Sequence, residues 1–600
     1  MKNSKTAVEV RLPSTHADEV IDWLGEIGYS HCFFVAGGNS MHLLNRARQT
    51  MTCVPFVHEV AAGIAAEYFN ATRLENGKAF VLITAGPGLT NLVTAIAGAF
   101  LESRELLVIG GQVKSTDLAR GAVRQRGIQE VDGVAIVRPI SKLAVRVEKP
   151  LLKADFLAIV RENSDGRPGP VFLEYCLDAQ GAPAVPVSSS QEYSVNEHKN
   201  RLPIASDDEV SKVRAMLDKS VRPVILIGGG ISRAGFSNVL SMLESLGAPI
   251  MTTWNGSDRI GSDHELYFGR PNTWGQRSSN VLLQGADIVI ALGTRLGLQQ
   301  TGFNWQQFVP LGDVVQVDID KGELLKGHPN LSVGVLGDAD DFIMRLIEPI
   351  HEPEIDRWGE WLSECRHLRD TMPLSEDANE RFDGYLNTYD FVLGLSRICD
   401  TNDIIVPCSS GGAFTSMMQA FNQKSGQVLL TDKGLASMGY GLSGAIGAAL
   451  SARERRTVLV EGDGGFSQNL QELATISVQR LNVKMFVFSN EGYASIRMTQ
   501  RNYFDGGYLG CDTETGLGFP NWQKLADAFG IRSFAISPNF ENDPEFLLEW
   551  RSDEPCLFVV PVHPEQTYFP KISSRVTTTG SMESAPLHEM TPSISMIGKD

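Results

Sequence analysis

Two polar residues, Asp463 and Asn490, stand where they could bind a metal ion. Asp463 follows the strand-like run RTVLVEG and Asn490 follows the run VKMFVFS, with a helix-prone stretch, residues 467–481, between them. Neighbouring strands of a parallel sheet end at the same edge, so the two side chains are expected to lie side by side. Carboxylate and carboxamide oxygens suit Mg²⁺, which takes few protein ligands and completes its coordination with phosphate and water oxygens.

The glycines around Asp463 point to the same site. Gly462, Gly464 and Gly465 would let main-chain amides approach a diphosphate at the start of the next helix. A Gly-Asp-Gly stretch alone is more often an ordinary turn, and an Asn after a strand is often only a cap. The strand, helix and strand between Asp463 and Asn490 favour a metal and diphosphate site over that alternative.

The elements that must position these residues belong to an α/β protein. Short apolar runs such as CFFVAGG, KAFVLITAGPG and ELLVIGGQ alternate with helix-prone stretches, and this alternation restarts twice along the chain. It predicts three doubly wound parallel sheets, each covered by helices on both faces. The expected organisation is a first domain (1–185), a linker (186–206), a middle domain (207–350), a second linker (351–385), a third domain (386–565) and a C-terminal extension (566–600).

Composition excludes several classes of protein. The 600 residues include 71 acidic and 53 basic side chains, and the net charge of −18 disfavours nucleic acid as a partner. The eight cysteines stand singly, without zinc-ligand spacing, as expected of reduced thiols in a cytoplasmic protein. No export signal is visible, and Gly-Pro-Gly and Asn91 interrupt the uncharged run 79–101, so no membrane span is expected.

GDG followed by Asn490 resembles the thiamine-diphosphate (ThDP) motif. This resemblance implies that Asp463, Asn490 and the carbonyl of Gly492 hold Mg²⁺ against the cofactor diphosphate. It also implies that the first domain binds the pyrimidine ring, where Glu59 in FVHEVAAG would protonate N1′. On the residues alone, Glu59 is equally an acidic side chain favoured at a helix N-terminus.

The stretch TAGPGLTN is similar to part of the pyrimidine-binding domain, and DKGLASMGYG is similar to the segment that bends the cofactor. Met438 would take the place of the bulky bending residue, although a methionine there could equally fill a gap in the core. The resemblance assigns to ThDP, besides the diphosphate-loop residues, Gly86, Asn91, Ser410, Gly411, Ser437 and Met438.

From about residue 15 to 570 the chain resembles the acetohydroxyacid synthase group. FVAGGNS places Gly38 beside the reacting carbonyl, and RGIQEVD places Gln129 at the active-site entrance with Ile128 beside it. These synthases bind FAD in the middle domain without using its redox chemistry. The matching residues here are Arg167, Gly229, Gly230, Thr253, Trp254, Arg295 and Asp338. The alternative for GGGISRAG, which is not GxGxxG, is a glycine turn that closes an α/β unit.

Three departures from that group concern the acceptor substrate. Thr499 replaces the group's tryptophan nine residues beyond Asn490, the loop 268–277 reads FGRPNTWGQR, and Gly412 and Ala413 replace a Gln-His pair. Because an indole is a large buried group, its loss should enlarge the acceptor pocket. The combination resembles a subset of ThDP flavoenzymes that transfer the two-carbon unit of pyruvate to a keto-deoxysugar nucleotide.

The expected function is therefore a ThDP- and Mg²⁺-dependent, decarboxylating carboligase that acts on pyruvate and a carbonyl acceptor. A homodimer or homotetramer is expected, with sites between subunits. Three alternatives stay open: a biosynthetic acetolactate synthase catalytic subunit, a simple decarboxylase, and a non-catalytic ThDP-fold binding or regulatory protein. The last should lack its pyrimidine carboxylate or its metal ligands, whereas Glu59, Asp463 and Asn490 are all present.

Overall fold

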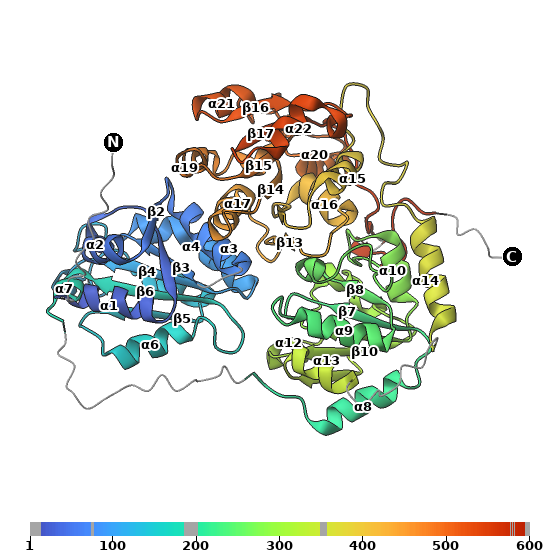
Figure 1. Ribbon diagram of the computed structural model, residues 1–600, viewed down its shortest axis with the longest axis horizontal. Coiled ribbons are helices and arrows are strands. Elements are labelled where there is room, and N and C mark those ends of the chain that lie inside the picture. The colour runs from blue at the N-terminus through green and yellow to red at the C-terminus, as the bar shows by residue number, and fades with distance from the viewer. Residues whose placement is uncertain are drawn as a thin grey trace.

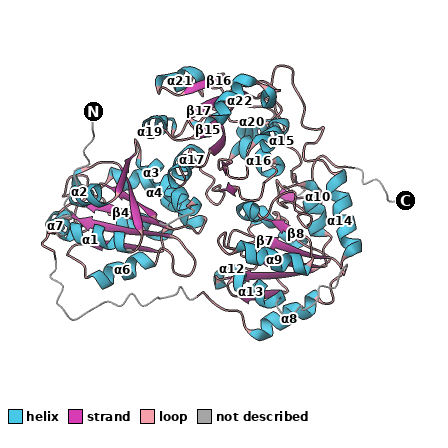
Figure 2. Ribbon diagram, viewed as in Figure 1, coloured by secondary structure: helices cyan, strands magenta, loops and turns pink. Residues whose placement is uncertain are grey.

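A computed structural model shows the three expected α/β units around three separate sheets (Figures 1 and 2). It describes residues 14–73, 77–184, 202–347, 357–576, 578, 580 and 582–594. In Figure 1 the first unit is blue, the middle unit green and the third orange to red. The predicted fold class is confirmed, because every pairing within the three large sheets is parallel.

The first domain contains a six-stranded sheet in the order β2-β1-β3-β4-β6-β5. Its strands are β1 (Tyr29–Phe34), β2 (Thr52–Pro55), β3 (Lys78–Ile83), β4 (Leu106–Gln112), β5 (Leu143–Val147) and β6 (Pro170–Cys176). Its helices are α1 (His16–Glu26), α2 (Met41–Thr50), α3 (Glu59–Thr72), α4 (Pro87–Leu101), α5 (Gly133–Val137), α6 (Lys153–Arg161) and α7 (Leu177–Gly181).

The middle domain has a five-stranded sheet in the order β11-β10-β9-β7-β8. Its strands are β7 (Pro223–Ile227), β8 (Ile250–Thr252), β9 (Ile288–Leu292), β10 (Asp313–Asp318) and β11 (Val333–Leu336). Its helices are α8 (Asp207–Leu217), α9 (Phe236–Leu246), α10 (Arg277–Gln284), α11 (Leu298–Thr301), α12 (Lys321–Leu325) and α13 (Ala339–Ile347). Helix α14 (Gly359–Thr371) lies in the segment expected as a linker, and its Trp361 and Cys365 are buried in this domain's core.

The third domain repeats the six-stranded pattern in the order β13-β12-β14-β15-β17-β16. Its strands are β12 (Ile404–Val406), β13 (Val428–Leu429), β14 (Thr457–Gly462), β15 (Val483–Ser489), β16 (Arg532–Ala535) and β17 (Cys556–Pro561). Its helices are α15 (Thr388–Ile398), α16 (Gly411–Ala420), α17 (Tyr440–Ser451), α18 (Asp463–Phe466), α19 (Leu473–Gln479), α20 (Ala494–Tyr503), α21 (Trp522–Ala528) and α22 (Pro544–Arg551).

Each large sheet reverses its strand order next to its first strand, and parallel α/β sheets bind ligands beyond the strand ends at such a reversal. The reversals lie between β1 and β3, between β7 and β9, and between β12 and β14. Gly38, Gly229 and Ser410 follow β1, β7 and β12, while Gly86, Arg295 and Asp463 follow β3, β9 and β14. The topology therefore places candidate site residues at all three reversals.

The first and third domains share one hydrophobic core through helices α3 and α17. A side-chain carbon at Gly447 would lie 2.0 Å from the carbonyl oxygen of Ala65, and one at Gly444 would lie 2.6 Å from the ring of Tyr68. The two helices thus approach at a separation that only glycine permits at these positions. This contact fixes the third domain against the first.

The predicted bounds of individual helices and strands agree less well with the structure than the predicted fold class does. Residues 467–481 were expected to form one helix, but the chain forms a 3-10 turn at Leu470–Glu472 and a short α19, with residues 467–469 outside both. The sequence reading missed β5, β11 and β16, because these strands are short or only partly buried.

The C-terminal extension contains the antiparallel pair β18 (Ser574–Val576) and β19 (Met582–Ser584). Residues 186–201 and 351–356 of the two expected linkers, and the last residues, 595–600, lie outside the described residues. Within the described ranges, no helix combines the length and the apolar character needed to cross a bilayer.

Candidate active site

Three groups that contain oxygen converge where β14 and β15 end. With its amide nitrogen turned toward them, Asn490 donates hydrogen bonds to the carbonyl oxygen of Gly492 at 2.7 Å and to Oδ2 of Asp463 at 3.3 Å. A 180° turn of the amide would present its oxygen instead, so that Asn490, Gly492 and Asp463 could each offer an oxygen to a cation. This three-oxygen corner consists of the three predicted metal ligands, and its donor set suits Mg²⁺.

Main-chain amides hold the carboxylate of Asp463 in this corner. Its Oδ1 accepts a hydrogen bond from the amide of Gly464 at 2.7 Å, and its Oδ2 accepts from Asn490 and Gly492 at 3.1 and 3.3 Å. Burial raises the pKa of Asp463 to about 7, although the three amides act in the opposite direction. A cation beside the carboxylate would offset that cost of burial.

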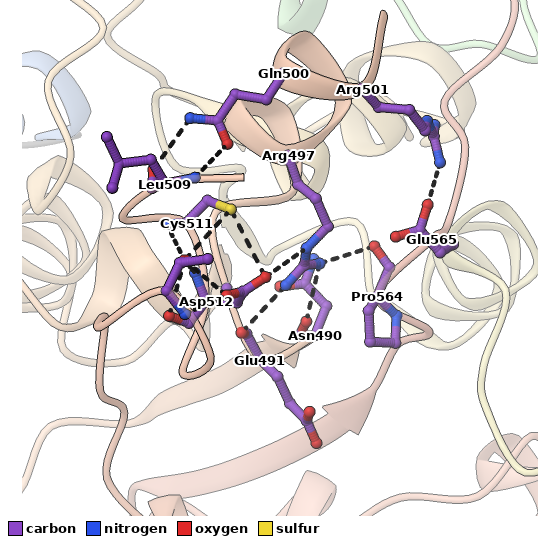
Figure 3. Close-up of polar contacts among 12 residues, drawn as sticks. Asn490, Glu491, Arg497, Gln500, Arg501, Leu509, Cys511, Asp512, Pro564 and Glu565 are labelled. Atoms are coloured by element: carbon purple, nitrogen blue, oxygen red, sulfur yellow. Dashed lines mark hydrogen bonds and ion pairs between the residues drawn. The ribbon is translucent and has the colours of Figure 1, made fainter. Parts of the chain in front are cut away.

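Arg497, which the sequence reading missed, contacts Asn490, Glu491 and Pro564 next to the corner (Figure 3). Its guanidinium donates to the carbonyls of Asn490, Glu491 and Pro564 at 3.5, 3.3 and 2.9 Å. It also lies 3.5 Å from a carboxylate oxygen of Asp512. Because its partners are mostly main-chain atoms, no residue pattern in the sequence marks it.

Tyr568 closes another side of the corner. It is buried, it forms a side-chain hydrogen bond with Asn490, and burial raises its pKa. A side-chain carbon at Gly412 would lie 2.1 Å from the Tyr568 ring, so Gly412, one of the three departures, leaves room for this tyrosine. Ser410 and Gly411, the neighbouring candidates, begin α16 after β12.

The candidate residues of the first domain form a second group. Glu59 is buried at the first position of α3, and its Oε2 accepts a hydrogen bond from the side chain of Asn91 at 3.0 Å. Gly86 has a φ of +62°, and a side-chain carbon there would lie 2.1 Å from the carbonyl oxygen of Gln129. The structure therefore places Glu59 and Asn91 in direct contact and Gly86 against Gln129.

Glu472 of the third domain reaches the chain just before Glu59. Its carboxylate accepts hydrogen bonds from the amides of His58 at 2.9 Å and Val57 at 3.4 Å, and from the hydroxyl of Thr475 at 2.6 Å. These amides precede helix α3, so a buried carboxylate from another domain caps its N-terminus. The sequence gives no sign of this contact, which joins residues more than 400 positions apart.

The residues assigned to FAD come together in one cavity. A space of about 540 Å³ lies between the three domains. All seven candidates line it, namely Arg167, Gly229, Gly230, Thr253, Trp254, Arg295 and Asp338. Lys433 and Gly434, which precede Met438 in the chain, line the same cavity, so it borders the segment expected to bend ThDP.

Comparisons with known proteins match all three domains. Residues 14–136 match the N-terminal TPP binding domain of thiamine pyrophosphate enzymes, residues 210–346 their central domain, and residues 410–560 their C-terminal TPP binding domain. The chain belongs to the thiamine pyrophosphate enzymes.

Relatives of this thiamine pyrophosphate enzyme are named acetolactate synthases. The chain is 29% identical over 586 residues to acetolactate synthase isozyme 1 large subunit of Escherichia coli (strain K12), covering 96% of this chain and 99% of the relative. It is 26% identical to the acetolactate synthase large subunit of Lactococcus lactis subsp. lactis (strain IL1403), covering 94% and 95%. The probable large subunit of Methanocaldococcus jannaschii is 29% identical, covering 85% of each chain. The predicted membership of the acetolactate synthase group is confirmed.

Other predicted site residues of the thiamine pyrophosphate enzyme are exposed or partly exposed. Ile128 is 84% exposed and Met438 is 37% exposed, both high values for large apolar side chains. Thr499 is exposed on α20, where its hydroxyl donates to the carbonyl of Ser495 at 2.9 Å. Gly38 begins the turn after β1, and Ser437 directly precedes Met438.

Proposed function

We propose that this chain is a ThDP- and Mg²⁺-dependent carboligase that decarboxylates pyruvate and transfers the two-carbon unit to a carbonyl acceptor. The observation that carries the proposal is the buried carboxylate of Glu59, held by Asn91 in a domain that matches the N-terminal TPP binding domain. The names of the relatives supply the reaction class. A non-catalytic member of the family would have no need of that carboxylate.

The residues of this chain divide the work. When bound, ThDP supplies the carbanion and the electron sink for decarboxylation. Asp463, Asn490 and the carbonyl of Gly492 would hold Mg²⁺, which binds the diphosphate. Glu59 would exchange a proton with the pyrimidine N1′, and Asn91 orients its carboxylate. Met438 would bend the cofactor, Gly38 would lie beside the reacting carbonyl and Gln129 would lie at the active-site entrance.

The test of this function replaces Glu59 with Gln. The amide keeps the size of the side chain but cannot exchange the proton, so CO₂ release from pyruvate should fall by at least about 100-fold. Calorimetric titration with ThDP and Mg²⁺ should still detect binding, because the three-oxygen corner is intact. Turnover that stays at the wild-type rate would exclude the proposed mechanism.

We also propose that the active sites form between two copies of the chain. Within the described residues, no hydrogen bond or ion pair joins Glu59 or Asn91 to Asp463, Asn490 or Gly492. Ile128 and Met438 are apolar, exposed and expected at the site, so a second copy would bury them. A homodimer is then the smallest active unit.

FAD is the proposed occupant of the cavity between the domains. Its volume of about 540 Å³ and its seven candidate residues support a nucleotide. The buried indole nitrogen of Trp254 and the side-chain oxygen of Asn255 both lack a partner in the described part of the chain, as expected where a ligand contributes polar atoms. The visible spectrum of the purified protein and mass spectrometry of the released cofactors test this assignment.

The acceptor is proposed to be larger than a 2-oxo acid, possessing a ketone on a nucleotide-activated deoxysugar. Thr499 in place of a tryptophan supports the proposal, since it leaves an exposed, small side chain on α20. The competing function is a biosynthetic acetolactate synthase, favoured by the names of the relatives. Product analysis with pyruvate alone separates the two: acetolactate as the main product would overturn the sugar acceptor.

A further inference from the structure

Two segments that differ from the synthase pattern, the loop 268–277 and helix α20 with Thr499, meet the start of the C-terminal extension. The amide of Ile572 donates to the carbonyl of Thr273, in the loop 268–277, at 2.9 Å. The ammonium of Lys571 donates to the sulfur of Met498, next to Thr499 on α20, at 3.4 Å. The loop, the helix and the extension therefore form one surface.

Lys571 is a positively charged residue at this junction, close to two aromatic rings. Its ammonium lies 5.5 Å from the ring centres of both Trp274 and Phe569. In the part of the chain that the structure describes, no carboxylate forms an ion pair with it, although the protein carries a net charge of −18. A partly buried cation without a counter-ion is costly, and aromatic rings offset only part of that cost.

A second cation lies nearby. Arg501 projects from α20 beside the extension and pairs with Glu565 (Figure 3). Burial lowers the pKa of Lys571, and the positive charge of Arg501 lowers it further. Lys571 and Arg501 together with the single carboxylate of Glu565 leave a net positive charge beside the rings of Trp274 and Phe569.

This junction lies next to the proposed reaction centre. Helix α20 begins two residues after Gly492, a member of the three-oxygen corner. Tyr568, three residues before Lys571, forms a side-chain hydrogen bond with Asn490. A ligand whose ketone reached the bound cofactor would extend past α20 toward Lys571.

We propose that Lys571, over Trp274, binds a phosphate group of the acceptor substrate. This inference rests on the proposed carboligase function and adds the residue that would recognise the phosphate of a nucleotide-linked carbonyl acceptor. The phosphate supplies the counter-ion that Lys571 lacks, and the partly exposed Trp274 offers a flat apolar face. A plain 2-oxo acid has no group that would reach this position.

A simpler account is that Lys571 only packs its methylene groups on Trp274. Lys571→Met distinguishes the two, since it keeps the length and apolar stem but removes the charge. Lys571→Arg keeps the charge. Lys212→Met, on the exposed face of α8, is the control for loss of one positive charge elsewhere.

The probes are uridine diphosphate, pyrophosphate and uridine, each titrated by calorimetry into full-length protein saturated with ThDP, Mg²⁺ and FAD. Uridine diphosphate should bind the wild type, and Lys571→Met should weaken it by about tenfold or more. Lys571→Arg and Lys212→Met should bind within about threefold of the wild type, and uridine should not bind.

Equal binding of uridine diphosphate by Lys571→Met and the wild type would overturn the proposal, as would no binding by the wild type. Pyrophosphate binding as tightly as uridine diphosphate would also overturn it, because the site would then recognise free phosphate. Release of CO₂ from pyruvate, measured on the same samples, should be unchanged in the control Lys212→Met. If the wild type releases none, the carboligase function fails while the titration still reports on Lys571.

Discussion

Arg497 holds the three-oxygen corner without contributing a ligand. Its guanidinium fixes the carbonyls of Asn490 and Glu491, so its removal should loosen the loop that presents the Asn490 and Gly492 oxygens to the metal. In Arg497→Met we expect the dissociation constant for Mg²⁺ to rise by about 10- to 100-fold, as for other residues that orient metal ligands.

Calorimetric titration of Mg²⁺ in the presence of ThDP measures this constant. Arg532→Met is the matched control, since Arg532 is an exposed arginine on the edge strand β16 that pairs with Glu545 and Glu549 of α22. Unchanged Mg²⁺ affinity in Arg497→Met, with circular dichroism confirming the fold, would show that the corner keeps its geometry without the hydrogen bonds from Arg497.

Asp432 gives a pH-dependent prediction. Burial, with a contribution from Glu102, raises its pKa from 3.8 to about 6, and its Oδ2 has no partner in the described residues. The native state thus binds this proton more tightly than the unfolded state does. Native stability from this group is gained as the pH falls through 6 toward 3.8.

Relative to Asp432→Asn, the wild type should gain about 1 kcal/mol in free energy of unfolding between pH 7 and pH 5. Urea denaturation of both proteins at the two pH values measures the change. A difference that does not vary with pH would mean that Asp432 titrates normally. The group matters for the site because its Oδ1 accepts from Ala436, two residues before Met438, at 3.0 Å.

Among single residues, the sequence predicts the metal ligands better than the residues that hold those ligands in place. Asp463 and Asn490 could be placed side by side because both follow strands of one parallel sheet, a relation that periodicity reveals. Arg497 and Tyr568 could not be found, since they act on carbonyls, on a glycine and on a side chain brought near by folding. The hydrogen bond from Asn91 supports the predicted role of Glu59. It joins residues 32 positions apart, so it depends on how α3 packs against α4.

Among the elements, α3 is the one whose position depends on another domain. Glu472 accepts hydrogen bonds from the two amides before Glu59, so it sets where the helix begins. Glu472→Gln would present an NH₂ group to one of those amides and remove the negative charge. We expect kcat for pyruvate to fall by about tenfold or more while Mg²⁺ affinity stays within about twofold.

Hydrogen exchange of the Val57 and His58 amides, followed by mass spectrometry, separates a local effect from a general loss of stability, which would speed exchange throughout the domain. It should quicken in Glu472→Gln more than exchange elsewhere in the first domain. Thr475→Val, which removes only the third hydrogen bond to Glu472, is the control. Uniformly faster exchange would mean that Glu472 supports the core rather than Glu59.

The same region explains why one predicted helix is broken. Apolar spacing over residues 467–481 favours a continuous helix, but the side chain of Asn469 donates to the carbonyl of Gly439 at 2.8 Å and its φ is −132°. Glu472 is likewise turned toward the first domain. Tertiary contacts therefore override the helical pattern, as side-chain partners that are distant in sequence cannot be read from periodicity.

For the whole molecule, the decisive question is whether one chain contains a complete site. The Glu59→Gln chain and an Asp463→Ala chain should each be inactive alone. If sites form between copies, unfolding and refolding the two together yields mixed dimers with one intact site each. At equal amounts, random pairing should restore about a quarter of the wild-type activity.

Release of CO₂ from pyruvate measures this recovery, and refolding each variant alone is the control. No recovery, despite dimers detected by light scattering, would place Glu59 and Asp463 of one chain in the same site. The three-domain fold itself was predictable because three series of strands recur. How the domains meet was not, because the glycines that allow α3 and α17 to touch look like ordinary small helix residues.

The close packing of α3 on α17 also bears on how the chain folds during synthesis. Helix α3 ends at Thr72 and α17 begins at Tyr440, about 370 residues later. At roughly 5–20 residues per second, the apolar face of α3 waits on the order of 20 to 70 seconds for its partner to leave the ribosome. A nascent first domain is therefore expected to be a client of chaperones, and translation rate should influence the yield of soluble protein.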